Sequence, residues 1–92
     1  MLEEAKRELR ITNTAYDQEV LDLIEAAKAD LHIPQIDPLK IVDTEPLIKR
    51  AIILYCKANF GLDNKDSEKY QAAYNNLTER LSLSLLYKDV SE

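Results

Sequence analysis

The stretch Glu45–Phe60, EPLIKRAIILYCKANF, is the most apolar run of the chain and decides its fold. Asp43 or Thr44 can cap the start of a helix here, and Pro46 is tolerated in a first helical turn. The only glycine of the chain, Gly61, suits the position just past a helix end. The stretch is therefore predicted to form one helix on which the rest of the chain packs.

This predicted helix is apolar around much of its circumference. Its wide face carries Leu47, Ile48, Ala51, Ile52, Leu54, Tyr55 and Ala58. Ile53 and Phe60 lie on the other side, flanked by Lys49, Arg50 and Lys57. A helix that is apolar on two sides is either central in its fold or covered on one side by a partner. We expect the wide face to hold the domain together, and the side of Ile53 and Phe60 to lack an obvious partner inside the chain. The alternative, in which other parts of the same chain cover that side, stays open.

Two shorter helices are predicted before this stretch. The first covers Leu2–Leu9, with acidic residues near its start and basic residues near its end, as the helix dipole favours. It is too short to be stable alone and must dock. Asn13 or Thr14 can cap the second helix, which runs to about Leu31 or His32. One face of the second helix is apolar and consists of Tyr16, Val20, Leu23, Ile24, Ala27 and Leu31.

Residues 33–43 form a connector between the second helix and the central stretch. Pro34 and Pro38 keep the residues before them out of helical geometry. The connector is otherwise apolar, with Ile33, Ile36, Leu39, Ile41 and Val42. We expect it to lie across the helices or to touch another subunit.

A fourth helix, capped by Asp66 or Ser67, is predicted to reach about Leu83. Its apolar stripe consists of Tyr70, Ala73, Tyr74, Leu77 and Leu81. The sequence thus predicts an all-α fold: a small bundle of about four helices, with the apolar Pro-containing connector between helices two and three. One domain over residues 1–84 and a C-terminal tail over residues 85–92 are expected.

Composition narrows the class of protein. Apolar residues make up 46% of the 92 residues and charged residues 32%, which is typical of a folded, soluble domain. The net charge of −5 argues against tight binding of duplex nucleic acid, which requires clustered Lys and Arg. No apolar run approaches the roughly 20 residues of a membrane span, and the N-terminus has no signal-peptide pattern. A single cysteine is compatible with a reducing compartment.

The residue types of catalytic and metal sites are scarce. His32 is the only histidine and Cys56 the only cysteine, so no common zinc set can form within one chain. Cys56 is predicted to be a small buried apolar residue, and His32 a surface or capping residue. Residues 63–66, DNKD, lack the glycine and the glutamate of a calcium loop. We therefore predict no catalytic, cofactor or metal site, and an enzyme is the class least favoured.

Charge is segregated along the chain. Residues 1–32 carry eight acidic and four basic side chains, whereas the central stretch carries three basic residues and only one acidic one, Glu45. These faces are either simply solvated, or the acidic face of one copy meets the basic face of the next. Contacts of that head-to-tail type close into rings or continue as filaments.

The order of segments resembles the head–tail connector, or adaptor, family of tailed phages, a group also described as DNA-packaging proteins. The similar segments are Leu9-Arg10-Ile11, Asp17–Lys28 with its Ala26-Ala27-Lys28 ending, Leu47–Leu54 closing on Phe60, and the amphipathic Tyr70–Leu85. The chain departs from the family where Gly61-Leu62 follow Phe60, in place of Glu or Asn and then Arg.

The resemblance implies a structural, non-enzymatic subunit of a phage or prophage particle. Such a subunit would assemble as a ring on the portal protein, carry a downstream stopper or tail-completion protein, and extend the channel through which DNA passes as cargo. It would sit at the head–tail junction of the virion after assembly in the bacterial host cytoplasm, with no membrane and no cofactor. The candidate assembly contacts are Lys49, Arg50, Ile53, Lys57, Phe60, Leu85, Leu86 and Tyr87.

The alternative is a small helical regulatory or antitoxin-like protein that binds a single protein partner. Oligomerisation on a purified portal separates the two hypotheses. On the first of them, Ile53→Asp is expected to spare the helix content of the monomer and to block assembly.

Overall fold

A computed structural model describes residues 1–32, 41, 45–60 and 65–83. These residues form four helices: α1 (Leu2–Leu9), α2 (Asp17–Leu31), α3 (Pro46–Asn59) and α4 (Ser67–Leu83). The described residues contain no strand. The predicted all-α bundle of four helices is therefore confirmed, including the bounds of the first helix.

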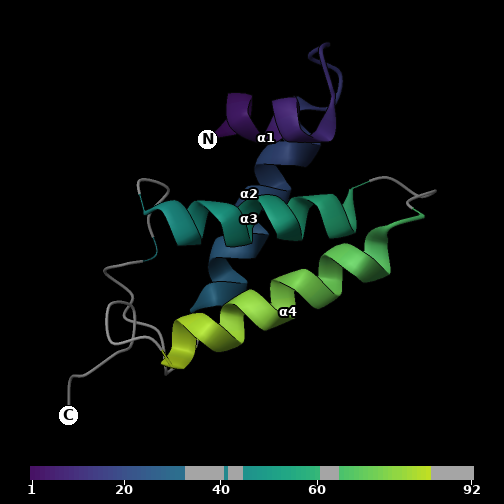
Figure 1. The fold of residues 1–92 in the computed structure, drawn as a ribbon. Helices are drawn as coiled ribbons and strands as arrows, with labels where there is room; N and C mark the ends of the chain where they lie inside the picture. The colour runs from purple at the N-terminus through teal and green to yellow at the C-terminus, as the bar shows by residue number, and fades with distance from the viewer. Residues whose placement is uncertain (33–40, 42–44, 61–64, 84–92) are drawn as a thin grey trace.

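Helix α3 lies at the centre of the bundle. Figure 1 shows α1 and α4 on opposite sides of α3, while α2 crosses behind it. Helix α3 is in contact with each of the other three helices, and α1 also contacts α2. The central stretch is thus the element on which the other helices pack, as its apolar pattern predicts.

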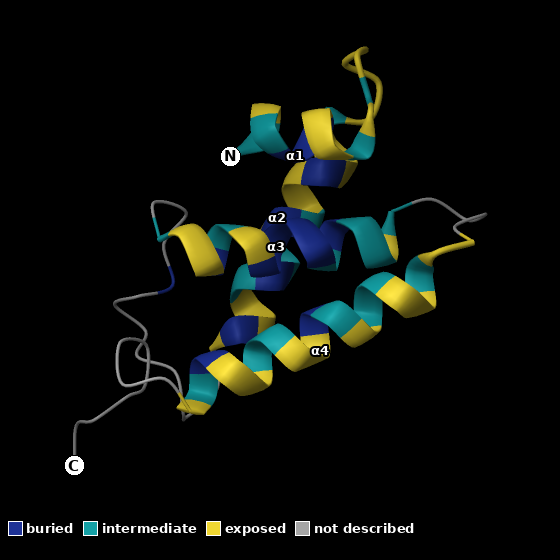
Figure 2. Ribbon diagram, viewed as in Figure 1, coloured by how far each residue is buried: buried dark blue, intermediate teal, exposed yellow. Residues whose placement is uncertain are grey.

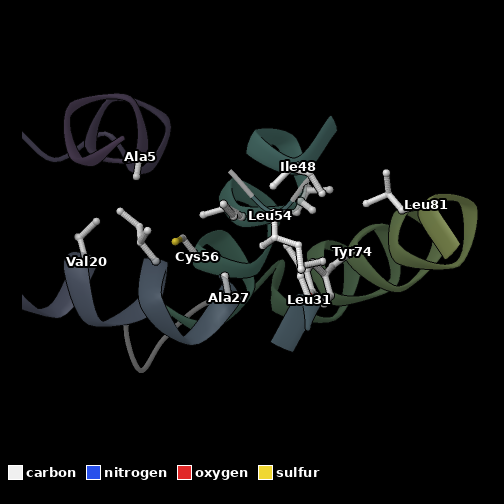
Figure 3. Close-up of a cluster of buried hydrophobic side chains, with 13 residues drawn as sticks. Ala5, Val20, Ala27, Leu31, Ile48, Leu54, Cys56, Tyr74 and Leu81 are labelled. Atoms are coloured by element: carbon white, nitrogen blue, oxygen red, sulfur yellow. The ribbon is translucent and has the colours of Figure 1, made fainter. Parts of the chain in front are cut away.

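The hydrophobic core collects around α3. Five α3 residues belong to the core: Ile48, Ala51, Ile52, Leu54 and Cys56. Helix α2 adds a stripe at helical spacing, namely Val20, Ile24, Ala27 and Leu31. Ala5 of α1, Ile41, and Tyr74 and Leu81 of α4 complete the set, and Figure 3 shows most of these side chains converging. Figure 2 shows the contrast between α3, which is buried along much of its length, and α4, whose outer side is exposed. Each fully buried aliphatic side chain contributes about 1.5–3 kcal/mol, so α3 dominates the stability of the fold.

Two residues predicted to face the core are largely exposed. Leu47 is 44% exposed and Tyr16 is 47% exposed. Leu47 lies in the first turn of α3, where the neighbouring helices do not cover the whole apolar circumference. Tyr16 precedes α2, and its ring instead contacts the ring of Phe60 edge to face, with centroids 5.6 Å apart.

The start of α2 differs from the prediction. Tyr16 occupies the N-cap position and makes no side-chain capping hydrogen bond. Asn13, predicted as a cap, accepts a hydrogen bond from the backbone N–H of Ala15 at 3.1 Å. An Asn side chain readily bonds the backbone two residues on, and this local turn uses the oxygen that a cap would need. At α3 the N-cap position is Glu45, which makes no side-chain capping hydrogen bond, while Asp43, Thr44 and Gly61 lie outside the described residues.

Helix α1 ends in a left-handed residue that is not glycine. Arg10 has φ 60° and ψ 42°, and is the one described residue other than glycine with positive φ. Its N–H donates to the carbonyl of Arg7, and the N–H of Ile11 donates to the carbonyl of Lys6 at 2.9 Å. This is the hydrogen-bond pattern of a Schellman helix end, in which the left-handed position is usually glycine. A residue with a Cβ costs about 1–2 kcal/mol in that conformation.

We expect Arg10→Gly to raise the free energy of unfolding by about 0.5–1 kcal/mol. Removal of the Cβ relieves the left-handed backbone, and part of that gain is offset by the greater freedom of glycine in the unfolded chain. Urea denaturation monitored by circular dichroism measures the change. Arg10→Ala is the matched control, because it removes the charge and keeps the Cβ. Equal stabilisation by both variants would contradict the backbone explanation.

Candidate assembly surface

Two lysines of α3 bind two glutamates of α1. The Nζ atom of Lys49 lies 2.6 Å from Oε2 of Glu4, and Nζ of Lys57 lies 3.4 Å from Oε1 of Glu8. Hydrogen bonding to Lys49, followed by its charge, holds the pKa of Glu4 below its ordinary value. The acidic side of α1 therefore meets the basic side of α3 within one chain.

Ile53 lies between these two lysines. Residues 49, 53 and 57 are spaced by one helical turn each and form one ridge on the surface of α3. Both flanking lysines pair with α1, and Ile53 between them is only 7% exposed. The expectation that this side of α3 has no partner inside the chain is wrong for Ile53, which is buried within the monomer.

The other candidate contacts have different surroundings. Lys57 also places its ammonium 5.1 Å from the ring centroid of Tyr70, so it contacts α1 and α4 at once. Phe60 is half-buried against Tyr16. Arg50 is exposed and makes no ion pair with any residue in the described part of the chain. Leu85, Leu86 and Tyr87 lie outside the described residues. The assignment of all eight residues as assembly contacts stays a prediction.

A third ion pair ties α1 to α2. The Nζ atom of Lys6 lies 2.7 Å from Oδ1 of Asp17, and the Lys6 residue is only 7% exposed. A buried ammonium is costly unless it is paired, so removing Asp17 alone would leave an uncompensated charge. Asp17 is an acid in the first turn of α2, where the helix dipole favours it, and its sequence position alone does not indicate a partner on α1. No sequence pattern separated Lys6 from its solvated neighbours.

A buried tyrosine joins α4 to α2. The hydroxyl of Tyr74 donates a hydrogen bond of 2.5 Å to Oδ2 of Asp30. Burial, then this bond to a carboxylate, raises the pKa of Tyr74. The ring of Tyr74 also packs edge to face on Tyr55, with centroids 5.4 Å apart. The apolar spacing of α4 predicted that Tyr74 faces the core, but nothing in the sequence marks Asp30 as its partner.

The remaining reactive side chains are placed as the sequence predicts. Cys56 is a buried free thiol, and burial raises its pKa to about 11, which lowers its reactivity at neutral pH. His32 is exposed at the end of α2. Within the described residues, no three His, Cys, Asp or Glu side chains gather in a way that could hold a metal ion. No described helix combines the length and apolar character needed to cross a membrane.

The described residues form a small all-α protein, in which ion pairs and a buried hydrogen bond connect one helix to another. A family model described as phage connector protein matches residues 1–88, so the chain belongs to that family. Membership makes it a structural component of a phage particle. Comparison with curated proteins and with solved structures finds no match.

The burial of Ile53 predicts that Ile53→Asp destabilises the monomer, by about 2–4 kcal/mol, because a carboxylate replaces buried apolar surface. Urea denaturation followed by circular dichroism measures this change. Arg50→Asp is the matched control on the exposed side of the same helix and should change the free energy of unfolding by less than about 0.5 kcal/mol. A fully stable Ile53→Asp monomer would show that this position is not part of the packed interior.

The Glu4–Lys49 pair predicts a pH dependence. Since the pKa of Glu4 is lower in the folded than in the unfolded chain, its contribution is present above the unfolded pKa and is lost as pH falls through the folded pKa. Glu4→Gln should therefore be less stable than the wild type at pH 7, and this difference should shrink as the pH is lowered through the acid range. Glu3→Gln, an exposed neighbour without an ion pair to any described residue, is the control. A Glu4→Gln difference that persists unchanged at pH 3 would argue against the ion pair.

Proposed function

We propose that this chain is the head–tail connector subunit of a phage or prophage particle, which assembles as a ring on the portal protein. The ring extends the channel for DNA and presents a platform for the stopper or tail-completion protein. The observation that carries this proposal is the family match over residues 1–88, which spans all four helices. Assembly takes place in the host cytoplasm, and the finished ring sits at the head–tail junction of the virion.

The charge of the chain supports a conduit rather than a DNA-binding role. A net charge of −5 gives the subunit little electrostatic attraction for phosphates. A channel lined by such subunits lets DNA pass as cargo without holding it.

The side of α3 that carries Arg50 supports a contact with a neighbouring protein. Arg50 is exposed, and the side chains of Lys49 and Lys57 remain partly accessible beside their glutamates. Arginine is enriched at protein interfaces because its planar guanidinium binds carboxylates in a bidentate manner. Phe60 and the tail residues Leu85, Leu86 and Tyr87 are proposed as further contacts, whereas Ile53 is buried within the monomer.

The test is the molar mass of the chain, measured by light scattering over a concentration series, alone and with the purified portal protein of the same phage. We expect a complex with several copies of the chain per portal. A monomer or dimer that never joins the portal at any concentration would overturn the proposal and favour a regulatory protein with a single partner.

Arg50→Glu should weaken portal-dependent assembly about tenfold, because it replaces a cation at the interface with an anion. Arg80→Glu makes the same charge change on the exposed side of α4 and serves as the matched control. Equal loss of assembly in both variants would mean that net charge, rather than the α3 surface, is responsible.

A further inference from the structure

Helix α1 is attached to the bundle by a few apolar residues and by three ion pairs that fix its position. It has eight residues, and an isolated helix of that length is not stable in water. Three ion pairs hold it: Glu4–Lys49, Glu8–Lys57 and Lys6–Asp17. One residue of α1, Ala5, belongs to the hydrophobic core, although Leu2 and Leu9 pack at its edge. The helix therefore exists only while docked, and its docking surface is a defined set of residues on α2 and α3.

The segment that joins α1 to α2 makes few contacts with the rest of the described structure. It begins at Arg10, which is held in the left-handed region despite its Cβ, and residues 12–16 are exposed. Its one side-chain hydrogen bond within the described structure is accepted by Asn13 from the backbone N–H of Ala15. Ile11 packs against the edge of the core, and the ring of Tyr16 contacts that of Phe60. Release of α1 would relieve the Arg10 backbone and give up the packing of Ile11. Short strained segments of this kind favour exchange of an element between copies.

We infer that α1 is an exchangeable helix that docks on α3 of a second copy of this chain. A departing α1 gives up its ion pairs with Lys49 and Lys57 of α3 and Asp17 of α2, and these residues form the surface that an identical α1 fits. The same three ion pairs then form between copies. Passed from each copy to the next, the exchange is a head-to-tail contact that can close into a ring. The inference concerns contacts between copies of this chain, and its test uses the protein without the portal.

The concentration of the protein determines whether α1 docks within its own chain or on a second copy. A linker as short as residues 10–16 gives α1 an effective concentration in the millimolar range at the docking surface of its own chain. The closed monomer therefore dominates in dilute solution. The exchanged form dominates only where copies are crowded to a similar local concentration, as they are when held side by side on a common support.

Charge reversal tests the exchange directly. The first variant carries Glu4→Lys with Glu8→Lys, and the second carries Lys49→Glu with Lys57→Glu. In each variant alone, α1 and α3 repel within a chain and also between identical chains. In the mixture, the basic α1 of the first variant matches the acidic α3 of the second, and the two unchanged surfaces match as well. Both variants remain net negative, so overall charge does not attract them to each other.

The equimolar mixture should form a mixed oligomer, enriched about tenfold over either homo-oligomer because repulsion is replaced by attraction at each pair. Native mass spectrometry detects the mixed species. Its thermal unfolding midpoint should rise above those of both separate variants, which a loose surface association would not achieve. The chain with all four substitutions restores the pairs within one chain and should behave as the wild-type monomer.

A mixture that stays monomeric, with the averaged unfolding curve of its components, would overturn the exchange while the four-substitution chain folds normally. If the double variants unfold, Glu8→Lys mixed with Lys57→Glu provides a milder pair for the same comparison. If this milder pair also forms no mixed species, the exchange is overturned as well. Failure of the wild-type chain to join the portal would instead count against the proposed connector role and leave this result unaffected.

Discussion

The burial of α3 on nearly every side is the constraint on which the rest of the structure depends. Its apolar residues cover most of the helix surface, so no single neighbour can remove them all from water. Helices α2 and α4 pack against the wide face, and α1 pairs with the two lysines on either side of Ile53. The placement of the other three helices follows from the need to surround this central helix.

Hydrophobic burial alone does not decide which helix takes which side. Helix α1 has too little apolar surface to compete for the wide face of α3, but two of its three glutamates match two lysines on the ridge side. Such pairs, being partly exposed, add little to the stability of the fold. The pairs therefore determine position and orientation, while the isoleucines and leucines supply most of the stability. The acidic side of α1 and the basic side of α3 therefore pair with each other inside one monomer.

Periodic features were predictable from the sequence, and single long-range contacts were not. The helices, the central role of Glu45–Phe60 and the buried state of Cys56 follow from spacing, which is local information. The spacing did not predict that Ile53 and Lys6 are buried, or that Tyr74 bonds Asp30. These features depend on residues from different helices, as the Lys6–Asp17 pair shows. Each depends on how helices cross, which a one-dimensional pattern does not contain. Arg10 was missed for a different reason, since nothing marks an arginine as left-handed when glycine is the expected residue.

The same division bears on the inferred exchange of α1 between copies. Helix α1 is too short to be stable alone, so it needs a docking surface, and a second copy presents an identical one. The ion pairs make this possible because they specify the surface without adding much stability, and an identical helix from another copy satisfies them equally well. A protein held together only by its apolar core would lack such an element, since each buried leucine resists exchange by itself.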